Sequence, residues 1–405
     1  MRYSFSKEPI TPDWPVRMAG YSSRTSKSTG VYDELYTRSL VLDDGERKVL
    51  IISIDICMID SSFVSKIKEI IEKRFGFKSK DIIIHTIHTH AGPVSMLRNN
   101  MPSQEVIDDT FRFRKHLEDK ILKNVEKCLI TSTEGYMEFG MGETYIGMSR
   151  RQSTPNGIKI GPNPKEEIDR KTFVMTINDI QGNVKVVLFN CPCHPVVLYP
   201  RNLYISADFP GVATKEIEKK FPGAEGMFLQ GAGADINPAI LVADEDYRDT
   251  FYSDVIFTGS ILANDVYNII CRGMRCVELS LETFLKRVPF SLSSDRSEES
   301  NYEDLNSEKC KMQITALKLS NDIRIICLDG EVCNQVGVNI RNLFEDENTI
   351  VLGYTNGYIG YIPTPKILHE GGYETISNIF KTPFAEDTEK ILLDGVKILK
   401  NSFTK

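Results

Sequence analysis

The alternation of apolar and polar residues near the start of the chain predicts three strands and one helix. Residues 37–42 and 48–56 have the pattern of strands, and Asp43-Asp44-Gly45 between them is a hairpin signal. Residues 64–75 repeat apolar side chains at helical spacing, and the isoleucine-rich segment 82–90 follows as another strand. Strand, helix and strand in this order predict a parallel βαβ unit with a right-handed crossover.

The rest of the chain mixes the same two patterns. It predicts helices at residues 104–128, 211–221, 256–270, in the segment ending at Phe344, and at about 386–400, and strands at residues 137–150, 173–177, 184–190, 227–230, 323–328 and 350–354. The pair 173–177 and 184–190 flanks a turn and predicts a second hairpin. Residues 293–309 are dense in Ser, Asp and Glu, which indicates a solvated loop or insertion. Hairpins combined with a βαβ unit predict an α/β fold, with a mixed sheet flanked by helices in a single domain over residues 1–405.

Composition excludes several classes of protein. The 405 residues are 41% hydrophobic and 26% charged, and the net charge of -7 gives no indication of nucleic-acid binding. No apolar run approaches the roughly 18 residues of a membrane span, and residues 1–20 lack an apolar signal core. We therefore expect a cytoplasmic protein. The nine cysteines have no framework spacing, so buried free thiols are expected, and Cys191 and Cys193 have no partner pair for a zinc knuckle.

The segment 82–93 is the part of the chain where histidines are most concentrated. It holds three of the six histidines, and Gly92-Pro93 ends it. Because side chains alternate along a strand, we expect His88 and His90 on one face and His85 on the other, within the core. Two imidazoles at a strand end suit metal binding and proton transfer. The alternative is a pair of polar residues at the rim of a sheet.

Polar residues also follow other predicted strands at glycine or proline breaks. These residues are His194, Asp235, Asn237, Glu331, Tyr358, Tyr361 and Tyr373. Ligands gather at the carboxyl ends of strands in α/β sheets, so two imidazoles, a carboxylate and a phenolate could surround one Zn²⁺ and leave a position for water. Zinc lowers the pKa of such a water to about 7 and thereby supplies a nucleophile. The alternatives are a helix-capping role for Glu331 and a turn-forming role for Asp235.

The histidine segment resembles a known motif. His88-Thr89-His90-Ala91-Gly92-Pro93 is similar to the HTHSGP motif of the neutral/alkaline (non-lysosomal) ceramidase family. Further blocks resemble the family's segments in the same order: Met18-Ala19-Gly20-Tyr21, Ser149-Arg150-Arg151, Cys193-His194-Pro195, the segment from Gln230 to Pro238, Gly330-Glu331, Asn356-Gly357-Tyr358-Ile359-Gly360-Tyr361 and Gly372-Tyr373-Glu374.

This resemblance implies a role for each matching residue. The family's ligands for one zinc ion correspond to His88, His194, Glu331 and Tyr373, and its catalytic residues correspond to His90, Arg150, Tyr361 and Asn237. Asn237 stands where the family has a serine that is important for activity. An amide cannot act as a nucleophile, so the reaction would depend on metal-activated water. We expect a distant branch of the family that keeps the metal centre.

The expected function is a zinc-dependent hydrolase that cleaves an amide-type C–N bond of a small or amphiphilic N-acyl compound. Two alternatives remain open at this point. The chain could be a metal-dependent lyase or hydrolase of a polar metabolite such as a sugar derivative, or a non-catalytic protein with a relic metal site. An apolar cleft would favour the first function, a narrow polar pocket the second, and a metal position fully enclosed by protein the third.

Overall fold

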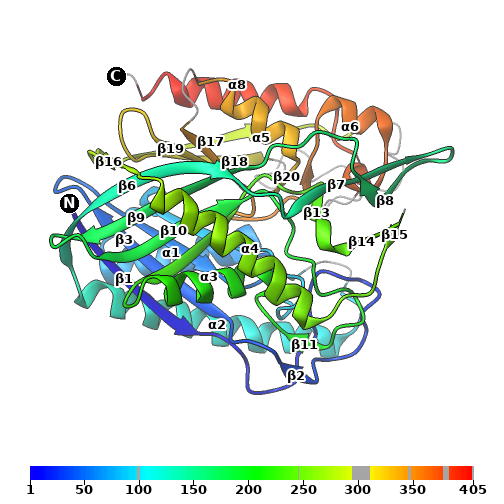
Figure 1. The fold of residues 1–405 in the computed structure, drawn as a ribbon, viewed down its shortest axis with the longest axis horizontal. Coiled ribbons are helices and arrows are strands. Elements are labelled where there is room, and N and C mark those ends of the chain that lie inside the picture. Colours follow the sequence, from blue (N-terminus) through cyan, green and yellow to red (C-terminus); the bar gives the residue numbers. More distant parts are fainter. Residues whose placement is uncertain (98–100, 245, 294–310, 345–347, 377–382, 404–405) are drawn as a thin grey trace.

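Two stacked β-sheets with helices on their outer faces form the framework of the molecule (Figure 1). The computed structural model describes residues 1–405 except 98–100, 245, 294–310, 345–347, 377–382 and 404–405. The helices are α1 (Ser61–Phe75), α2 (Gln104–Ile130), α3 (Asp208–Lys220), α4 (Tyr252–Cys271), α5 (Asn334–Arg341), α6 (Pro365–Glu370), α7 (Tyr373–Ile376) and α8 (Thr388–Lys400). Helices α2 and α8 lie on opposite sides of the molecule (Figure 1).

The larger sheet has nine strands and is mixed. Its order is β12-β10-β9-β6-β1-β3-β4-β5, with β16 paired to β6. The strands are β1 (Arg2–Pro9), β3 (Tyr36–Asp43), β4 (Lys48–Ile54), β5 (Ile82–Thr86), β6 (Thr133–Glu143), β9 (Lys171–Asp179), β10 (Val184–Cys191), β12 (Glu225–Gln230) and β16 (Arg275–Val277). Three predictions are confirmed here. The β3–β4 and β9–β10 pairs are antiparallel hairpins, and β4, α1 and β5 form a parallel βαβ unit.

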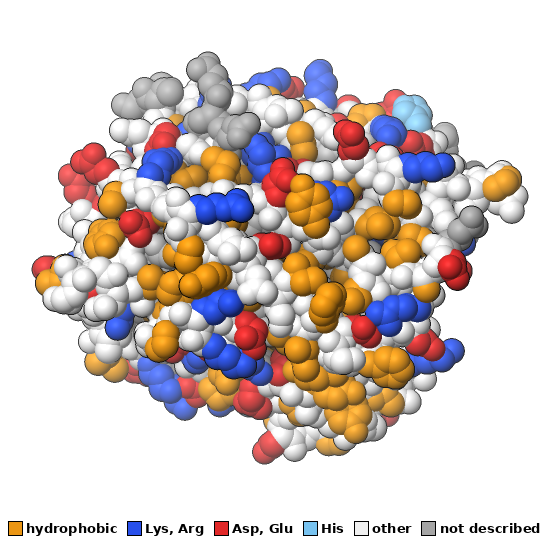
Figure 2. Space-filling model, viewed as in Figure 1, with side chains coloured by type: hydrophobic (Ala, Val, Ile, Leu, Met, Phe, Trp, Pro, Cys, Tyr) orange, Lys and Arg blue, Asp and Glu red, His pale blue; other side chains and the backbone are white. Residues whose placement is uncertain are grey.

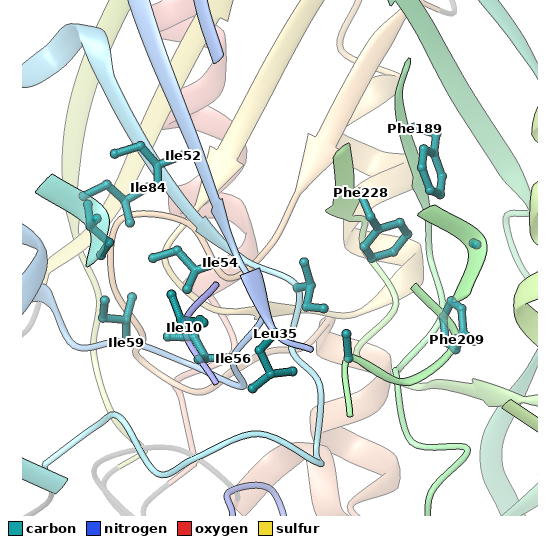
Figure 3. Packing of buried hydrophobic residues seen from close by; sticks show 14 of the residues in the cluster. Ile10, Leu35, Ile52, Ile54, Ile56, Ile59, Ile84, Phe189, Phe209 and Phe228 are labelled. Carbon is teal, nitrogen blue, oxygen red and sulfur yellow. The ribbon is translucent and has the colours of Figure 1, made fainter. Parts of the chain in front are cut away.

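The alternation of side chains along β4 shows why the sheet is covered on both faces. Leu50, Ile52 and Ile54 belong to the cluster under helices α1 to α4. Val49 and Ile51 belong to the cluster between the two sheets. Figure 3 shows the first cluster, where isoleucines of β4 and β5 pack near the side chains of Ile10 and Leu35. Burial of apolar surface on both faces is the main contribution to the stability of such a layer.

The smaller sheet has four strands in the order β17-β18-β19-β21. They are β17 (Glu282–Pro289), β18 (Lys311–Lys318), β19 (Arg324–Leu328) and β21 (Thr349–Leu352). In β19, Ile325 and Cys327 face the larger sheet, whereas Ile326 and Leu328 face α5 and α8. The predicted α/β fold with a sheet core flanked by helices is therefore confirmed, with a second sheet that the sequence pattern did not indicate.

Several predicted boundaries are corrected by the structure. The expected strand 137–150 is two strands, β6 and β7 (Gly147–Thr154), and β7 joins a separate small sheet with β8 (Gly157–Asn163) and β13 (Ile236–Pro238). The strands β1, β17 and β18 were not predicted, because their mixed polar and charged residues hide the apolar face. The predicted Ser/Asp/Glu loop at 293–309 lies almost entirely outside the described residues.

The surface carries both signs of charge. On the face shown in Figure 2, Lys and Arg side chains alternate with Asp and Glu, and hydrophobic side chains gather at lower right, near β2 (Gly30–Val31) and β11 (Tyr204–Ile205) in Figure 1. Within the described part of the chain, no helix has both the length and the hydropathy that crossing a membrane requires.

Candidate metal centre and active site

His88 lies in a loop directly after β5, and not in the strand itself. The strand ends at Thr86, and the backbone of His88 has a positive φ of 68°, which non-glycine residues seldom adopt. The expected strand through residue 90 is therefore wrong, but His88 and His90 do lie together, with Nε2 atoms 3.2 Å apart, while His85 contacts Thr355 and Gln230 instead. The loop holds His88 by two contacts, from its N–H to the carbonyl of Ile56 (3.0 Å) and from its Nδ1 to the carbonyl of Cys57 (2.8 Å).

His194 is held in the same manner by the glycine-rich block that follows β12. Its N–H donates to the carbonyl of Ile236 (2.9 Å), and its Nδ1 donates to the carbonyl of Gly233 (2.9 Å). A side chain at Gly233 would clash, because an added Cβ would lie 2.5 Å from the backbone nitrogen of Cys193. The glycine thus lets two backbone segments approach closely enough to orient the imidazole.

Glu331 reaches the two imidazoles from a third direction. It lies on β20 (Glu331–Val332), which pairs in parallel with β22 (Tyr361–Ile362), so that Glu331 is opposite Tyr361. The residue is 2% exposed, and its carboxylate accepts hydrogen bonds from the hydroxyls of Tyr354 and Tyr358. The capping alternative is wrong, because α5 begins three residues later with Cys333 as its N-cap.

We refer to His88, His194 and Glu331 as the metal trio. The two Nε2 atoms lie 3.1 Å apart, and Oε2 of Glu331 is 3.4 Å from that of His88 and 3.3 Å from that of His194. One ligand atom from each residue lies within 4.8 Å of the others, and all three residues are buried. Since a carbonyl can only accept, both Nδ1 atoms carry the proton and both Nε2 atoms present lone pairs to one another.

Two lone pairs and a carboxylate at this separation require a positive charge between them. Burial raises the pKa of Glu331, but His88 and His194 outweigh it and hold this pKa well below its usual range. Burial lowers the pKa of His194 to about 4, whereas Cys57 and Glu331 outweigh burial at His88 and raise its pKa to about 10. Without a metal, the raised pKa of His88 favours an added proton as the source of this charge. A divalent cation would replace it, and two histidines with a carboxylate are a donor set that zinc accepts.

His90 lies at the edge of the metal trio. Its Nε2 is 3.2 Å from Nε2 of His88, and burial together with His88 and His194 holds its pKa well below the usual value. Its ring packs against Tyr21, with ring centroids 4.9 Å apart, and against Gly20, where an added Cβ would lie 2.3 Å from the ring. The early Met18-Ala19-Gly20-Tyr21 block therefore forms the cradle of this histidine. Within the described residues, Cys57, His88 and His90 make a second group with ligand spacing.

Arg150, Tyr361 and Asn237 form a second group of contacts, in which Tyr361 is paired with Glu331 across β20 and β22. The guanidinium of Arg150 donates to the hydroxyl of Tyr361 (2.9 Å) and to Oδ1 of Asn237 (3.4 Å). A buried carboxylate, Glu374, neutralises Arg150 at 2.9 Å and Arg151 at 2.5 Å. We call Arg150, Arg151 and Glu374 the arginine–glutamate cluster. Strand β7 carries the two arginines, and its pairing with β13 brings Asn237 beside Met148, close to them.

Tyr373 is placed next to this group but at its outer edge. Its ring centroid is 5.6 Å from that of Tyr361, the guanidinium carbon of Arg150 lies 5.7 Å from its ring, and the residue is 44% exposed. Its assignment as a zinc ligand stays a prediction.

The structure thus brings seven of the eight predicted site residues into one region, in which six are buried and His90 is partly buried, with Tyr373 at its border. His85 is a core residue, as expected: Thr355 contacts its Nδ1, and its Nε2 accepts from the N–H of Gln230. Three contributors were not predicted, namely Cys57, Tyr354 and Glu374. Glu374 was within reach of sequence reasoning, because it directly follows Tyr373 in a recognised block. Cys57 acts through its backbone carbonyl, which no residue pattern reveals.

Comparison with known proteins agrees with this arrangement. The family described as "Neutral/alkaline non-lysosomal ceramidase, N-terminal" matches residues 7–243. The neutral ceramidase of Pseudomonas aeruginosa is 22% identical over 250 residues, which are 58% of this chain and 37% of that protein. A neutral ceramidase of Oryza sativa is 25% identical over 243 residues, which are 56% of this chain and 29% of that protein. The chain therefore matches only about a third of the length of these curated relatives.

The fold agrees over nearly the whole chain. The crystal structure of neutral ceramidase from Pseudomonas aeruginosa superimposes with a TM-score of 0.80, covering 99% of this chain and 74% of that one, at 17% sequence identity. This likeness extends beyond residue 243 and includes the segments that carry Glu331 and Tyr361. Because the family match covers more than half of the 405 residues, the chain belongs to the neutral/alkaline non-lysosomal ceramidase family.

Proposed function

We propose that this protein is a zinc-dependent hydrolase that cleaves the amide C–N bond of an N-acyl compound. The observation that carries the proposal is the metal trio, in which two imidazole lone pairs and one carboxylate face a single point in the protein interior. The family and its relatives called neutral ceramidases support the reaction class. A zinc ion held by His88, His194 and Glu331, with Tyr373 as the fourth proposed ligand, would supply Lewis-acid polarisation and activation of water.

Arg150 and Tyr361 are the proposed stabilisers of negative charge on the substrate carbonyl oxygen. Strand pairing puts Tyr361 opposite Glu331, and Arg150 donates to the hydroxyl of Tyr361 at 2.9 Å. Both are buried donors that are already fixed before the reaction, which is the condition under which such groups stabilise a transition state most strongly. In this arrangement neither side chain has to reorganise as charge develops.

His90 and Asn237 take the remaining proposed roles. Nε2 of His90 lies within hydrogen-bonding distance of the metal trio, so this imidazole can receive a proton and pass it to the leaving amine. Asn237 has no nucleophilic atom, and its Oδ1 accepts from Arg150. We assign it to positioning the guanidinium. The attacking oxygen therefore comes from water and not from the residue at the family's serine position.

The experiment that tests this function combines metal analysis with a substrate screen. The purified protein is expected to contain close to one equivalent of zinc. Removal of the metal with a chelator should abolish release of free fatty acid from short- and long-chain N-acyl amines, and zinc should restore it. Full activity in the metal-free protein would contradict the proposal.

A second candidate follows from Asn237 in place of serine. In this version the metal trio is kept, and the substrate is a polar metabolite such as a sugar derivative, with His90 or Tyr361 as the base. The same screen separates the two functions, because turnover of polar metabolites but not of N-acyl amines would favour the second. Zinc binding without turnover of either class would indicate a relic site.

A further inference from the structure

A small basic cavity lies between α1 and the smaller sheet, apart from the metal trio. Its volume is about 70 Å³. The side chains that line it are Ser61, Val64, Ser65, Lys68, Ser79, Lys80, Leu285, Arg287, Gln313, Thr315 and Asn356. Three of these side chains are cationic and none is acidic, and no member of the metal trio is among them. Such an excess of one charge around a cavity needs an explanation.

One face of α1 provides the floor of this basic cavity. Ser61, Val64, Ser65 and Lys68 follow one another at positions i, i+3, i+4 and i+7, which share one side of a helix. Lys68 is 7% exposed. Among the described residues, no carboxylate or hydrogen-bond acceptor is paired with its ammonium group. Buried lysines are almost always paired, so an unpaired lysine that lines a cavity indicates a missing anion.

The acidic side chains nearest in sequence to this cavity are engaged elsewhere. Asp60 caps α1 at the N–H of Phe63 and forms an ion pair with Arg114. The carboxylate of Asp81 contacts Thr283. Asp329 accepts from the N–H of Gln313 at 3.0 Å and interacts electrostatically with Arg287, so it acts on Arg287 and not on Lys68. None of the three lines the cavity. Among the described residues, the ammonium group of Lys68 is therefore left without an acidic partner, whereas Lys80 donates to the carbonyl of Thr283 at 3.3 Å.

Hydroxyl and amide groups complete the lining. Ser61, Ser65 and Thr315 carry hydroxyls that can donate to an anion, and Asn356 and Gln313 carry amides. The amide of Asn356 already donates to Thr315 (3.1 Å), and its carbonyl accepts from the N–H of Ile84 (3.0 Å), so this side chain is fixed in place. The lining thus combines point charges with preorganised polar groups, as anion sites in proteins do.

We propose that this cavity is a binding site for one tetrahedral oxyanion of the phosphate class, held by Lys68, Lys80 and Arg287. The volume admits a single phosphate group and excludes a nucleotide. Burial lowers the pKa of Lys68 to about 7, with an opposing effect of Cys327 and a further lowering by Arg287. A bound oxyanion would restore the charged form of the lysine. The phosphate group could belong to free phosphate or to a phosphate monoester.

The test measures the stability of the zinc-loaded protein against inorganic phosphate and sulfate, with chloride and acetate at the same ionic strength. Phosphate and sulfate are expected to raise the melting temperature saturably, by about 2–5 °C, whereas chloride and acetate should not. Lys68→Met should abolish this rise and Arg287→Gln should weaken it. A rise that survives both substitutions would place the anion elsewhere, for example on the zinc ion, and would overturn the proposal.

Two matched variants control for charge alone. Lys73→Met removes a lysine from the exposed side of α1, and Lys286→Gln removes one from the neighbouring position of β17, where side chains point the other way. Both should respond to phosphate as the unmodified protein does. Without any anion, Lys68→Met should melt at a higher temperature than the unmodified protein, because it removes an unpaired buried charge. A lysine with a merely structural role would give the opposite sign.

A further arm identifies the source of the phosphate group. Glycerol 3-phosphate is compared with inorganic phosphate, and vesicles of phosphatidate in phosphatidylcholine are compared with phosphatidylcholine alone. Binding of any of these that depends on Lys68 supports the site, and the tightest ligand names the source. Absence of Lys68-dependent binding in all arms would overturn the proposal.

Discussion

The metal trio and the arginine–glutamate cluster lie on two sides of the same active region, and they balance their charges in different ways. In the cluster, one carboxylate of Glu374 is shared by two guanidinium groups, so opposite charges are already paired. In the metal trio, two imidazole nitrogens face each other and Glu331, and among the described residues no Lys or Arg forms an ion pair with Glu331. The first region is complete as a protein structure, and the second is complete only with an added positive charge.

This difference separates structural from chemical roles. A change at Glu374 or Arg151 should act mainly on folding, because it breaks an ion pair between groups of the protein itself, whereas Arg150 also has the catalytic role proposed above. A change in the metal trio should act mainly on metal binding and turnover, because these residues bind a cation that comes from solution. The following predictions test that division, beginning with the largest expected effect.

His194→Ala is expected to lower activity by at least ~10³-fold and to abolish zinc retention, since it removes one of the two imidazole donors. Zinc content by elemental analysis and turnover of an N-acyl substrate measure the two effects. His369→Ala removes an exposed histidine and is the matched control, which should retain both. Retention of zinc and activity in the first variant would end the proposal of a metal centre at this position.

Glu374→Gln is expected to lower the free energy of unfolding by about 3–5 kcal/mol, because two buried guanidinium groups lose the carboxylate that they share. Chemical denaturation measures this loss. Glu370→Gln, which affects a half-exposed pair with Arg151, should cost less than about 1 kcal/mol. The Glu374→Gln protein that remains folded should still bind zinc. Loss of zinc at full stability would contradict the division between the two regions.

Lys68 carries a buried positive charge without a negative partner, the reverse of the metal trio. This charge makes the stability of the protein depend on pH. Its pKa is about 7 in the folded chain against 10.5 when exposed, because burial disfavours the charged form and Arg287 adds to this effect. Below pH 7 both states carry the charge and the penalty is complete. The penalty falls as the pH rises from 7 and vanishes above 10.5, because the lysine is then neutral in both states.

Lys68→Met should therefore be more stable than the unmodified protein by about 2–4 kcal/mol at pH 6, and equal to it near the upper end of this range. Denaturation curves at several pH values in anion-free buffer measure the difference. The thiol of Cys327, which acts on Lys68, stays neutral over this range because burial raises its pKa to about 12. A stability difference that does not change with pH would contradict this account.

Tyr358→Phe is expected to weaken zinc binding by about 10–100-fold without unfolding the protein, because the hydroxyl donates to the carboxylate of Glu331 and orients it. Competition with a chelator of known affinity measures the change. Tyr145→Phe removes an exposed hydroxyl and should leave zinc affinity unchanged. If Tyr358→Phe bound zinc as tightly as the unmodified protein, the orientation of Glu331 would have to depend on Tyr354 alone.

The local pattern of the chain was sufficient for the individual elements around the site. The predicted hairpin 37–56, the βαβ unit and helix α2 are all present, because each depends on contacts between neighbours in sequence. The second sheet was missed for the opposite reason. Strands β17 and β18 are separated by residues 290–310. Their apolar positions can be recognised as core positions only when β17 is paired with β18 and β18 with β19.

For the site, the sequence likewise predicted the identity of the residues but not their arrangement. The residues His88, His194, Glu331, Arg150 and Tyr361 could be named from the sequence, because glycine and proline breaks and family-like blocks mark them. Their arrangement could not be. The contact of His88 with His194 depends on a left-handed backbone conformation and on the carbonyls of Cys57 and Gly233, none of which leaves a periodic signal.

The sequence by itself determined which elements form and which side chains could bind a metal, since these properties follow from residue type and local spacing. The tertiary structure alone decided that the two imidazoles meet with their lone pairs and that Arg150 is neutralised by Glu374 instead of by the metal trio. It also decided that Lys68 is buried beside a cavity. Charge balance in a protein interior depends on distances between segments far apart in sequence, and only the folded chain fixes those distances.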